Sequence, residues 1–139
     1  MKTAYLLDTN VVSEAASRNP EARVLDWCEA HSRESHLSCI TLGEIWKGIH
    51  LMPAGKRKAA LLDWATRLET DLSNPPLPFD AETFKIWGRL YAKHESAGFN
   101  MGVLDSLLAA TALRHGLVVV TRNTADFPSD VVTINPWIA

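Results

Sequence analysis

Cysteine is scarce in this chain, and no hydrophobic run is long enough to cross a membrane. Cys28 and Cys39 each stand among apolar neighbours. We therefore expect two buried, reduced thiols rather than a disulfide or a pair of metal ligands. A strand-like segment at residues 4–7 begins so close to the amino terminus that we expect no signal peptide. These absences predict a cytoplasmic protein that makes no membrane contact.

The chain also lacks an excess of positive charge, because 14 basic and 16 acidic residues give a formal net charge of −2. This balance argues against a protein that holds nucleic acid by general electrostatic attraction. A nucleic-acid contact would have to be local, made either by clustered basic residues or by metal ions that convert an acidic pocket into a phosphate site. Neither a Ser-His-Asp spacing nor a Cys/His zinc pattern occurs.

The chain does contain an alternation of strand-like and helix-like segments. The apolar runs of strand length are residues 4–7, 37–40, 77–79, 117–120 and 131–134. We expect the helices at residues 20–27, from Thr41 onward, at 56–71, from Asp80 to Gly98, and at 104–114, which Gly116 closes. No repeat, low-complexity tract or linker divides the chain. The pattern predicts a single α/β domain over residues 1–139 with a mostly parallel sheet.

Four acidic residues fall where strands end or helices begin. Asp8 ends the first strand, and Asp126 follows the fourth strand by a short loop. Glu44 lies one turn into the helix after the second strand, and Asp105 lies in the first turn of the last helix. In a parallel α/β fold, strand ends and helix beginnings share one edge of the sheet, where ligands bind. Separate segments can therefore deliver carboxylates to one place.

Clustered carboxylates repel one another and are costly to desolvate unless a cation lies between them. Mg²⁺ and Mn²⁺ prefer oxygen ligands, and such an ion can activate water and neutralise a phosphodiester. The pattern predicts a metal-dependent site. Its predicted catalytic and metal-binding residues are Asp8, Glu44, Asp105 and Asp126.

Each of these carboxylates also has a structural interpretation. Asp8 could cap a short helix that begins near Val11. The sequence Thr41-Leu42-Gly43-Glu44 fits a capping box, Asp105 could complement a helix dipole, and Asp126 could be a turn residue. Capping can explain each carboxylate by itself. It does not explain why all four fall at one edge of the sheet, so the structural interpretations are weaker for the set than for any single residue.

Polar and basic residues could support the same site. Thr121 and Asn123 are predicted to orient water or phosphate, although turn hydrogen bonding explains them almost as well. Lys47, Arg89 and Lys93 are the basic residues that we expect along an RNA path, with solvated helix faces as the alternative.

The order and spacing of several stretches resemble the PIN-domain family, and within it the VapC/FitB-like toxins of type II toxin–antitoxin pairs. The stretches are Leu6-Leu7-Asp8-Thr9-Asn10, Ser38-Cys39-Ile40-Thr41-Leu42-Gly43-Glu44-Ile45, Leu104-Asp105-Ser106-Leu107-Leu108-Ala109-Ala110, Val120-Thr121-Arg122-Asn123 with Asp126-Phe127, and Asn135-Pro136-Trp137. The resemblance implies an α/β/α sandwich whose central parallel sheet has strand order 3-2-1-4-5. Asp8 and the loop that carries Asp126 would then meet where the strand order reverses.

The resemblance also implies an activity and partners. Asp8, Glu44 and Asp105 would form the main acidic site with Mg²⁺ or Mn²⁺, and Asp126 would complete it. The expected reaction is hydrolysis of single-stranded RNA by a homodimeric toxin that a cognate antitoxin inhibits. DNA would be contacted only indirectly, through the antitoxin.

Two other functions compete with this one. A phosphotransferase of the haloacid-dehalogenase type would use Asp8 as a nucleophile, but such enzymes usually carry a second aspartate where this chain has Asn10. A catalytically silent PIN-fold module could instead bind RNA or a protein partner. The intact acidic positions count against that alternative.

Overall fold

Short strands and longer helices alternate along residues 2–139, which are the residues that this computed structural model describes. Their order is β1 (Tyr5–Leu7), α1 (Thr9–Glu14), α2 (Ala22–Ala30), η1 (Ser32–Glu34), β2 (Ser35–His36), α3 (Cys39–His50), α4 (Lys56–Asp71), α5 (Ala81–Ser96), α6 (Val103–His115), β3 (Val118–Val120), η2 (Thr124–Asp126) and β4 (Thr133–Ile134). The alternation confirms the predicted α/β class.

The sheet is parallel and has the order β2-β1-β3-β4. The strands β1, β3 and β4 fall within the predicted strands 1, 4 and 5, and β2 directly precedes the predicted strand 2, so the relative order of these four positions is confirmed. The predicted strand at residues 77–79 is reduced to a single parallel bridge between Ser38 and Leu77. This bridge lies beside the segment that follows β2, on the side where the predicted order 3-2-1-4-5 places the third strand.

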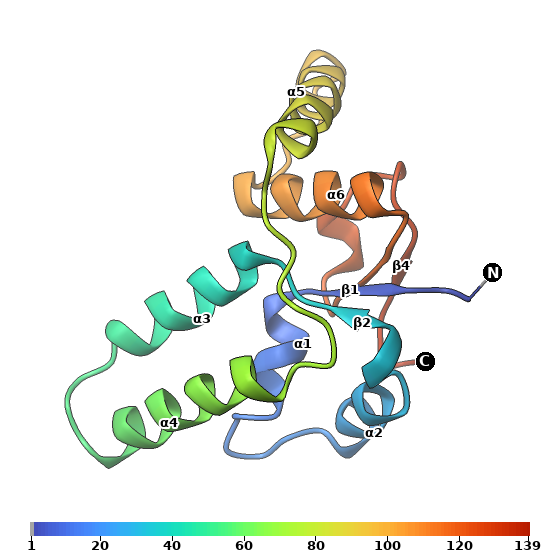
Figure 1. Ribbon diagram of the computed structural model, residues 1–139. Coiled ribbons are helices and arrows are strands. Elements are labelled where there is room, and N and C mark those ends of the chain that lie inside the picture. The colour runs from blue at the N-terminus through green and yellow to red at the C-terminus, as the bar shows by residue number, and fades with distance from the viewer. Residues whose placement is uncertain (1) are drawn as a thin grey trace.

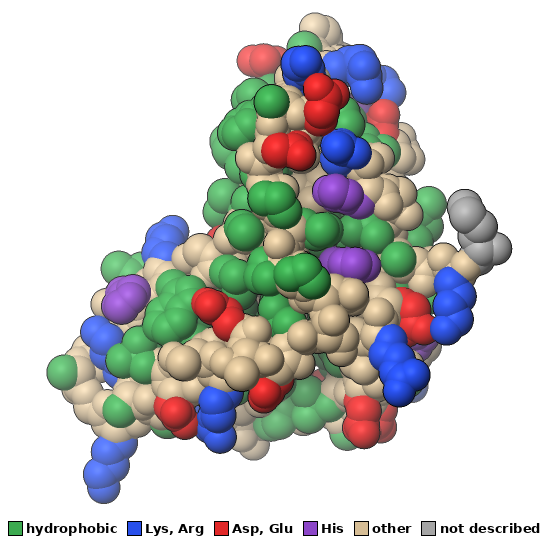
Figure 2. All heavy atoms as spheres, viewed as in Figure 1, with side chains coloured by type: hydrophobic (Ala, Val, Ile, Leu, Met, Phe, Trp, Pro, Cys, Tyr) green, Lys and Arg blue, Asp and Glu red, His purple; other side chains and the backbone are tan. Residues whose placement is uncertain are grey.

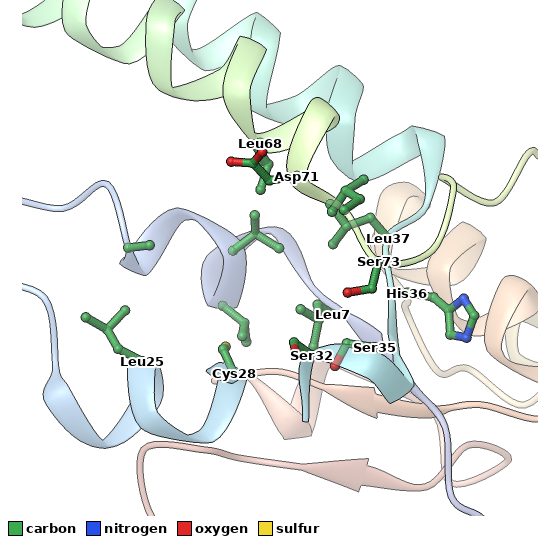
Figure 3. A pocket seen from close by; sticks show the side chains of 14 residues that line it. Leu7, Leu25, Cys28, Ser32, Ser35, His36, Leu37, Leu68, Asp71 and Ser73 are labelled. Atoms are coloured by element: carbon green, nitrogen blue, oxygen red, sulfur yellow. The ribbon is translucent and has the colours of Figure 1, made fainter. Parts of the chain in front are cut away.

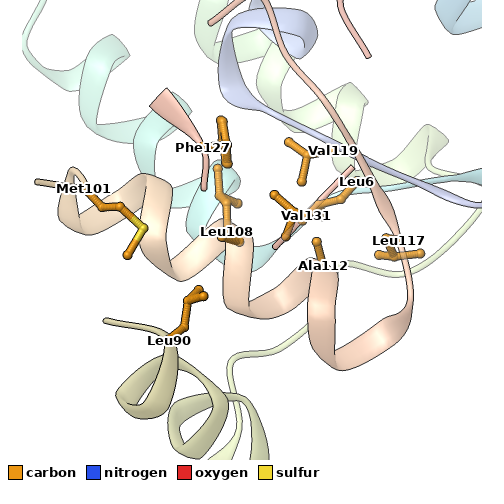
Figure 4. Packing of buried hydrophobic residues seen from close by; sticks show 10 residues of the cluster. Leu6, Leu90, Met101, Leu108, Ala112, Leu117, Val119, Phe127 and Val131 are labelled. Atoms are coloured by element: carbon orange, nitrogen blue, oxygen red, sulfur yellow. The ribbon is translucent and has the colours of Figure 1, made fainter. Parts of the chain in front are cut away.

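Helices cover both faces of the sheet because side chains along each strand point alternately to opposite sides. Leu6 and Val119 face a buried cluster that also contains Leu108 and Ala109 of α6. Figure 4 shows Leu90 of α5 packed into the same cluster. In Figure 1, α5 and α6 lie on one side of the sheet, while α1 and α2 lie on the other and α3 pairs with α4.

The second cluster lies on the opposite face, where Leu7 and Val120 point. It takes Val11 from α1, Val24 from α2 and Ile45 from α3. The central strands β1 and β3 therefore have no solvated face, which explains why the run Val118–Val120 has no polar interruption. Their carboxyl ends come together at one edge, where Leu7 is followed by Asp8 and Val120 by Thr121.

The prediction of a strand at residues 37–40 was wrong. The strand β2 ends at His36, and Ser38 caps α3, its Oγ accepting from Ile40 N at 3.1 Å. Thr41 is therefore no cap, and its buried hydroxyl has no hydrogen-bond partner among residues 2–139. The apolar run joins Leu37, which follows the strand, to Ile40 of the next helix, and a short run of this kind does not reveal the boundary.

The other predicted helices are present, with small differences at their ends. The helix α4 spans the predicted residues 56–71. Asp80 caps α5, since its Oδ1 accepts from Thr83 N at 3.0 Å, and Gly116 closes α6 in the left-handed conformation at φ 66°. Pro20 precedes its helix instead of opening it, because α2 begins at Ala22.

The cysteine prediction was right about pairing and wrong about burial. Cys28 and Cys39 are both free thiols, but Cys39 is exposed and Cys28 is only half-buried. Desolvation raises the pKa of the Cys28 thiol above its usual value. Within residues 2–139, no helix has the length and apolar character needed to span a bilayer.

Candidate active site

Asp8 is fixed at the carboxyl end of β1. Its backbone N–H donates to Val120 O at 2.9 Å, which joins it to the end of β3. Its buried carboxylate accepts from Thr9 N at 2.7 Å, Thr121 Oγ1 at 2.8 Å and Asn10 Nδ2 at 3.2 Å. Asp8 is therefore the N-cap of α1, which begins at Thr9 rather than near Val11. The cap also holds the carboxylate in one position, so the structural and functional interpretations do not exclude each other.

Glu44 reaches the same edge from α3. Its Oε1 accepts from Thr9 Oγ1 at 2.7 Å, so a hydroxyl next to Asp8 holds it from another helix. The capping-box interpretation was wrong, because Ser38 is the cap and Glu44 lies in the second turn of α3. The hydrogen bond to Thr9 ties Glu44 to the segment that carries Asp8.

Asp105 lies in the first turn of α6, and its surroundings raise its pKa. Burial raises its pKa, and the negative charges of Asp8, Asp126 and Glu44 add to this effect, bringing it to about 6 from the usual 3.8. A side chain at Gly102, the N-cap of α6, would place its Cβ 3.3 Å from Asp105 Oδ2. The glycine leaves room for this carboxylate.

Asp126 and the supporting polar residues come from the segment after β3. Asp126 is exposed in η2, and its charge contributes to the raised pKa of Asp105. Thr121 is fully buried and links the segments, since its Oγ1 donates to Asp8 and accepts from Asn123 N at 3.0 Å. The contact of Asn123 with Thr121 is therefore made through its backbone. The topology thus brings the four predicted carboxylates into one electrostatic cluster.

The donor set suits a hard divalent cation in its chemistry. It consists of carboxylate oxygens, and mutual repulsion among them is the kind of strain that a cation relieves. Among residues 2–139, however, no three Asp, Glu, His or Cys side chains already stand close enough to hold a metal ion together. The arrangement is an open acidic cluster, and metal binding stays a prediction.

The predicted RNA-contact residues lie on helix surfaces. Lys47 is exposed in the last turn of α3. Arg89 and Lys93 line a pocket of about 380 Å³ with Asp130, and Lys93 Nζ donates to Asp130 Oδ2 at 2.7 Å. On the face drawn in Figure 2, basic side chains are scattered among acidic ones and do not form a single band. Their contact with RNA stays a prediction.

Thr9 and Asn10 are the site residues that the sequence analysis gave no role. Both side chains hydrogen-bond to a predicted carboxylate, Thr9 to Glu44 and Asn10 to Asp8. The available signal was their position, since two polar residues directly follow Asp8 at the end of a buried strand. Their partners could be identified only from the tertiary structure.

Two pockets border the helices on the α1 side of the sheet. One, of about 240 Å³, includes Thr9 and Glu44 in its lining and so adjoins the acidic cluster. The other, of about 210 Å³, lies between α1, α2 and the end of α4 (Figure 3). Its lining is mostly apolar, with Leu7, Leu25 and Leu68, and includes none of the four predicted carboxylates. Only the first pocket belongs to the candidate site.

Comparison with known proteins gives matches along nearly the whole chain. Residues 5–129 match the model of a family described as the PIN domain. The chain is 43% identical to the plasmid stability protein StbB of Pseudomonas syringae, over 96% of this chain and 99% of that protein. It is 38% identical to the VapC ribonuclease Y4jK of Sinorhizobium fredii, over 95% and 96% of the two chains. Identity to the toxin FitB of Neisseria gonorrhoeae is 36%, over 95% and 97%.

Solved structures agree with these sequence matches. A structure of FitAB bound to a DNA fragment contains a chain that superposes with a TM-score of 0.88 at 34% identity. The superposition covers 96% of this chain and 95% of the other. The likeness therefore includes the sheet and the helices that carry the acidic cluster.

Proposed function

This chain belongs to the PIN-domain family, and from that premise we propose that it is an endoribonuclease that acts as the toxin of a toxin–antitoxin pair. The observation that carries the proposal is the placement of Asp105 among the charges of Asp8, Asp126 and Glu44 at the carboxyl edge of the sheet. Relatives named as a ribonuclease and as a toxin support the assignment. The proposed substrate is single-stranded RNA.

The proposed cofactor is Mg²⁺ or Mn²⁺, held by Asp8, Glu44, Asp105 and Asp126. When bound, such an ion lowers the pKa of water and neutralises charge on a phosphodiester. The carboxylates repel one another before the ion binds, which lowers the stability of the fold. Binding of the ion would relieve this repulsion and stabilise the folded protein.

The residues of the chain position the reacting groups. The hydrogen bonds from Thr9, Asn10 and Thr121 keep the Asp8 carboxylate at the end of β1, while Thr9 also holds Glu44. We assign to the exposed Asp126 the orientation of the attacking water. Water adds to phosphorus as the bond to the 3′ oxygen breaks, which leaves a 5′-phosphate on one product and a 3′-hydroxyl on the other.

The proposed partners follow from the relatives. FitAB has been solved as a complex with DNA, and we propose a cognate antitoxin for this chain, through which any DNA contact would be made. We also propose a homodimer. The alternative, a catalytically silent binding module, is disfavoured because none of the acidic residues that the family resemblance implies is replaced, and a relative is named as a ribonuclease.

A cleavage assay tests the proposal. Purified protein is incubated with end-labelled single-stranded RNA in Mg²⁺, in Mn²⁺ and in EDTA. We expect fragments with 5′-phosphate ends that appear with a divalent ion and disappear with EDTA. An absence of cleavage with either ion, or cleavage that EDTA does not affect, would overturn the proposed metal-dependent activity.

A further inference from the structure

Arg122 is tied to the candidate active site through its backbone. Its N–H donates to Asn10 Oδ1 at 3.2 Å, and Asn10 Nδ2 in turn donates to Asp8 Oδ2 at 3.2 Å. On the other side, the Arg122 carbonyl accepts from Asn135 Nδ2 at 3.3 Å. Although Arg122 is exposed, its main chain is held in place two hydrogen bonds away from the Asp8 carboxylate.

The side chain of Arg122 is held as well. Its guanidinium lies over the Trp137 ring, 4.9 Å from the ring centroid. Trp137 is itself fixed, because its N–H donates to Asn135 Oδ1 at 2.9 Å and its carbonyl accepts from Arg23 Nη1 at 3.0 Å. Figure 1 shows the chain end beside α2, which carries Arg23. We call Arg122 and Trp137 together the Arg122–Trp137 platform.

Stacking leaves the hydrogen-bonding edge of a guanidinium free, and this edge matches the geometry of phosphate oxygens. Within residues 2–139, no protein group accepts a hydrogen bond from the Arg122 guanidinium, and no carboxylate forms an ion pair with it. Lys93 and Arg67, by contrast, form ion pairs with Asp130 and Asp63. Arg122 thus presents an unused set of donors held over Trp137, and its backbone is joined through Asn10 to Asp8 of the acidic cluster.

We propose that the Arg122–Trp137 platform binds a phosphate of the RNA strand, adjacent to the phosphodiester that lies at the acidic cluster. This inference rests on the proposed function and adds to it the path of the substrate. A chain with net charge −2 has little general attraction for RNA, so a phosphate that lies outside the proposed metal site needs a local cation such as Arg122. A single strand carries a phosphate at every nucleotide, so a strand threaded through the site brings one to this neighbouring position.

The binding test separates RNA affinity from catalysis. Binding of a labelled single-stranded RNA to the Asp105→Asn protein is measured by fluorescence anisotropy at several salt concentrations. The substitutions Arg122→Ala and Arg122→Lys are then added to this background. Arg33→Ala is the matched control, because it removes the same charge from an exposed position in η1, before β2 and hence at the opposite edge of the sheet.

We expect Arg122→Ala to weaken RNA binding roughly tenfold, as loss of a charge-assisted contact does. The slope of log K against log salt should become shallower by about 0.7, the value for one phosphate of a single strand. Arg122→Lys keeps the charge without the planar fork and should lose less affinity. Arg33→Ala should leave the affinity much less changed.

Three results would contradict the inference in distinguishable ways. RNA binding by Arg122→Ala equal to that of its parent would overturn the platform while leaving the proposed function intact. Unchanged RNA binding together with lost co-purification of a partner protein would place Arg122 in a protein interface and overturn the RNA assignment. If the wild-type protein neither binds nor cleaves RNA, the proposed function fails and the inference fails with it.

Discussion

Asp105 and Asp130 are both partly buried aspartates, and their environments shift their pKa values in opposite directions. Burial and the charges of Asp8, Asp126 and Glu44 raise the pKa of Asp105 to about 6. At Asp130, hydrogen bonds from Lys93 and His94 hold the pKa below its usual value. Lys93 Nζ lies 2.7 Å and His94 Nε2 lies 2.6 Å from its two oxygens.

The difference separates a structural carboxylate from a functional one. Asp130 has its cations within the chain, so its charge is stabilised in the folded protein. Asp105 has other anions around it, so its charge is destabilised until a cation arrives from outside. A cluster that destabilises the fold on its own is a feature of functional sites more than of structural ion pairs.

The largest expected effect concerns catalysis. The substitution Asp105→Asn removes a proposed metal ligand and should lower RNA cleavage at least about 10²-fold, because metal ions supply several kcal/mol of transition-state stabilisation. Asp130→Asn is the matched control and should keep activity near that of the wild type. Initial rates on labelled RNA with Mn²⁺ measure both. An equal loss of cleavage rate in the two variants would contradict the assignment of Asp105 as functional and Asp130 as structural.

A smaller effect is expected at Thr121, which holds the Asp8 carboxylate. Thr121→Val removes the 2.8 Å hydrogen bond to Asp8 Oδ2, together with the acceptor of Asn123 N, while keeping the side-chain shape. We expect a loss of roughly tenfold in cleavage rate, as is typical when a residue that orients a metal ligand is changed. Thr111→Val is a suitable control, because its buried hydroxyl bonds only to Leu107 O within α6. Full activity of Thr121→Val would show that Asp8 needs no orientation from the Thr121 hydroxyl.

The two aspartates should also differ in the sign of their effect on stability. Without divalent ions at pH 7.5, Asp105→Asn should raise the melting temperature, because it relieves repulsion. Asp130→Asn should lower the free energy of unfolding by about 1 kcal/mol, which is about 3 °C for a chain of this size. Differential scanning fluorimetry measures both. Asp8→Asn is a poor substitute, because Asp8 also caps α1 and bonds to Thr121. A lower melting temperature for Asp105→Asn would contradict the repulsion.

The pH dependence should show the same contrast at smaller amplitude. Since the folded pKa of Asp105 lies above its usual value of 3.8, the free energy of unfolding should fall as pH rises from about 4 to about 6. For Asp130, whose pKa is lowered, the stabilisation is present above its usual pKa and is lost as pH falls through the lowered value. The free energy of unfolding is measured with urea between pH 4 and 8. Its fall between pH 4 and 6 should be absent in Asp105→Asn and retained in Asp130→Asn. A wild-type free energy of unfolding that does not fall between pH 4 and 6, or a fall that both variants keep equally, would contradict this.

Local patterns were enough to predict most of the fold. Leu61, Leu62, Ala65 and Leu68 stand at helical spacing, and α4 spans the predicted residues 56–71. The predicted strand at residues 117–120 is an uninterrupted apolar run, and β3 lies within it. The strand prediction at residues 37–40 failed because one apolar run continues from the residue after β2 into the first turn of α3. Leu37 and Ile40 are both hydrophobic, and only the hydrogen bond from Ile40 N to Ser38 Oγ shows where the helix begins.

The candidate carboxylates could be predicted because strand ends and helix beginnings share one edge of a parallel sheet. Which atoms hold them could not be predicted, because those contacts join residues far apart in the chain. Thr9 with Glu44 and Thr121 with Asp8 are examples. Arg122 was overlooked for the same reason, since its role depends on Asn10 and Trp137 coming together.

Anomalous diffraction from crystals soaked in Mn²⁺ tests most directly whether the acidic cluster holds a divalent ion. We predict a peak among the carboxylate oxygens of Asp8, Glu44, Asp105 and Asp126 in the wild type, lost in Asp105→Asn and kept in Asp130→Asn. Saturating Mn²⁺ that leaves this cluster empty, or that binds only at other carboxylates, would contradict the account.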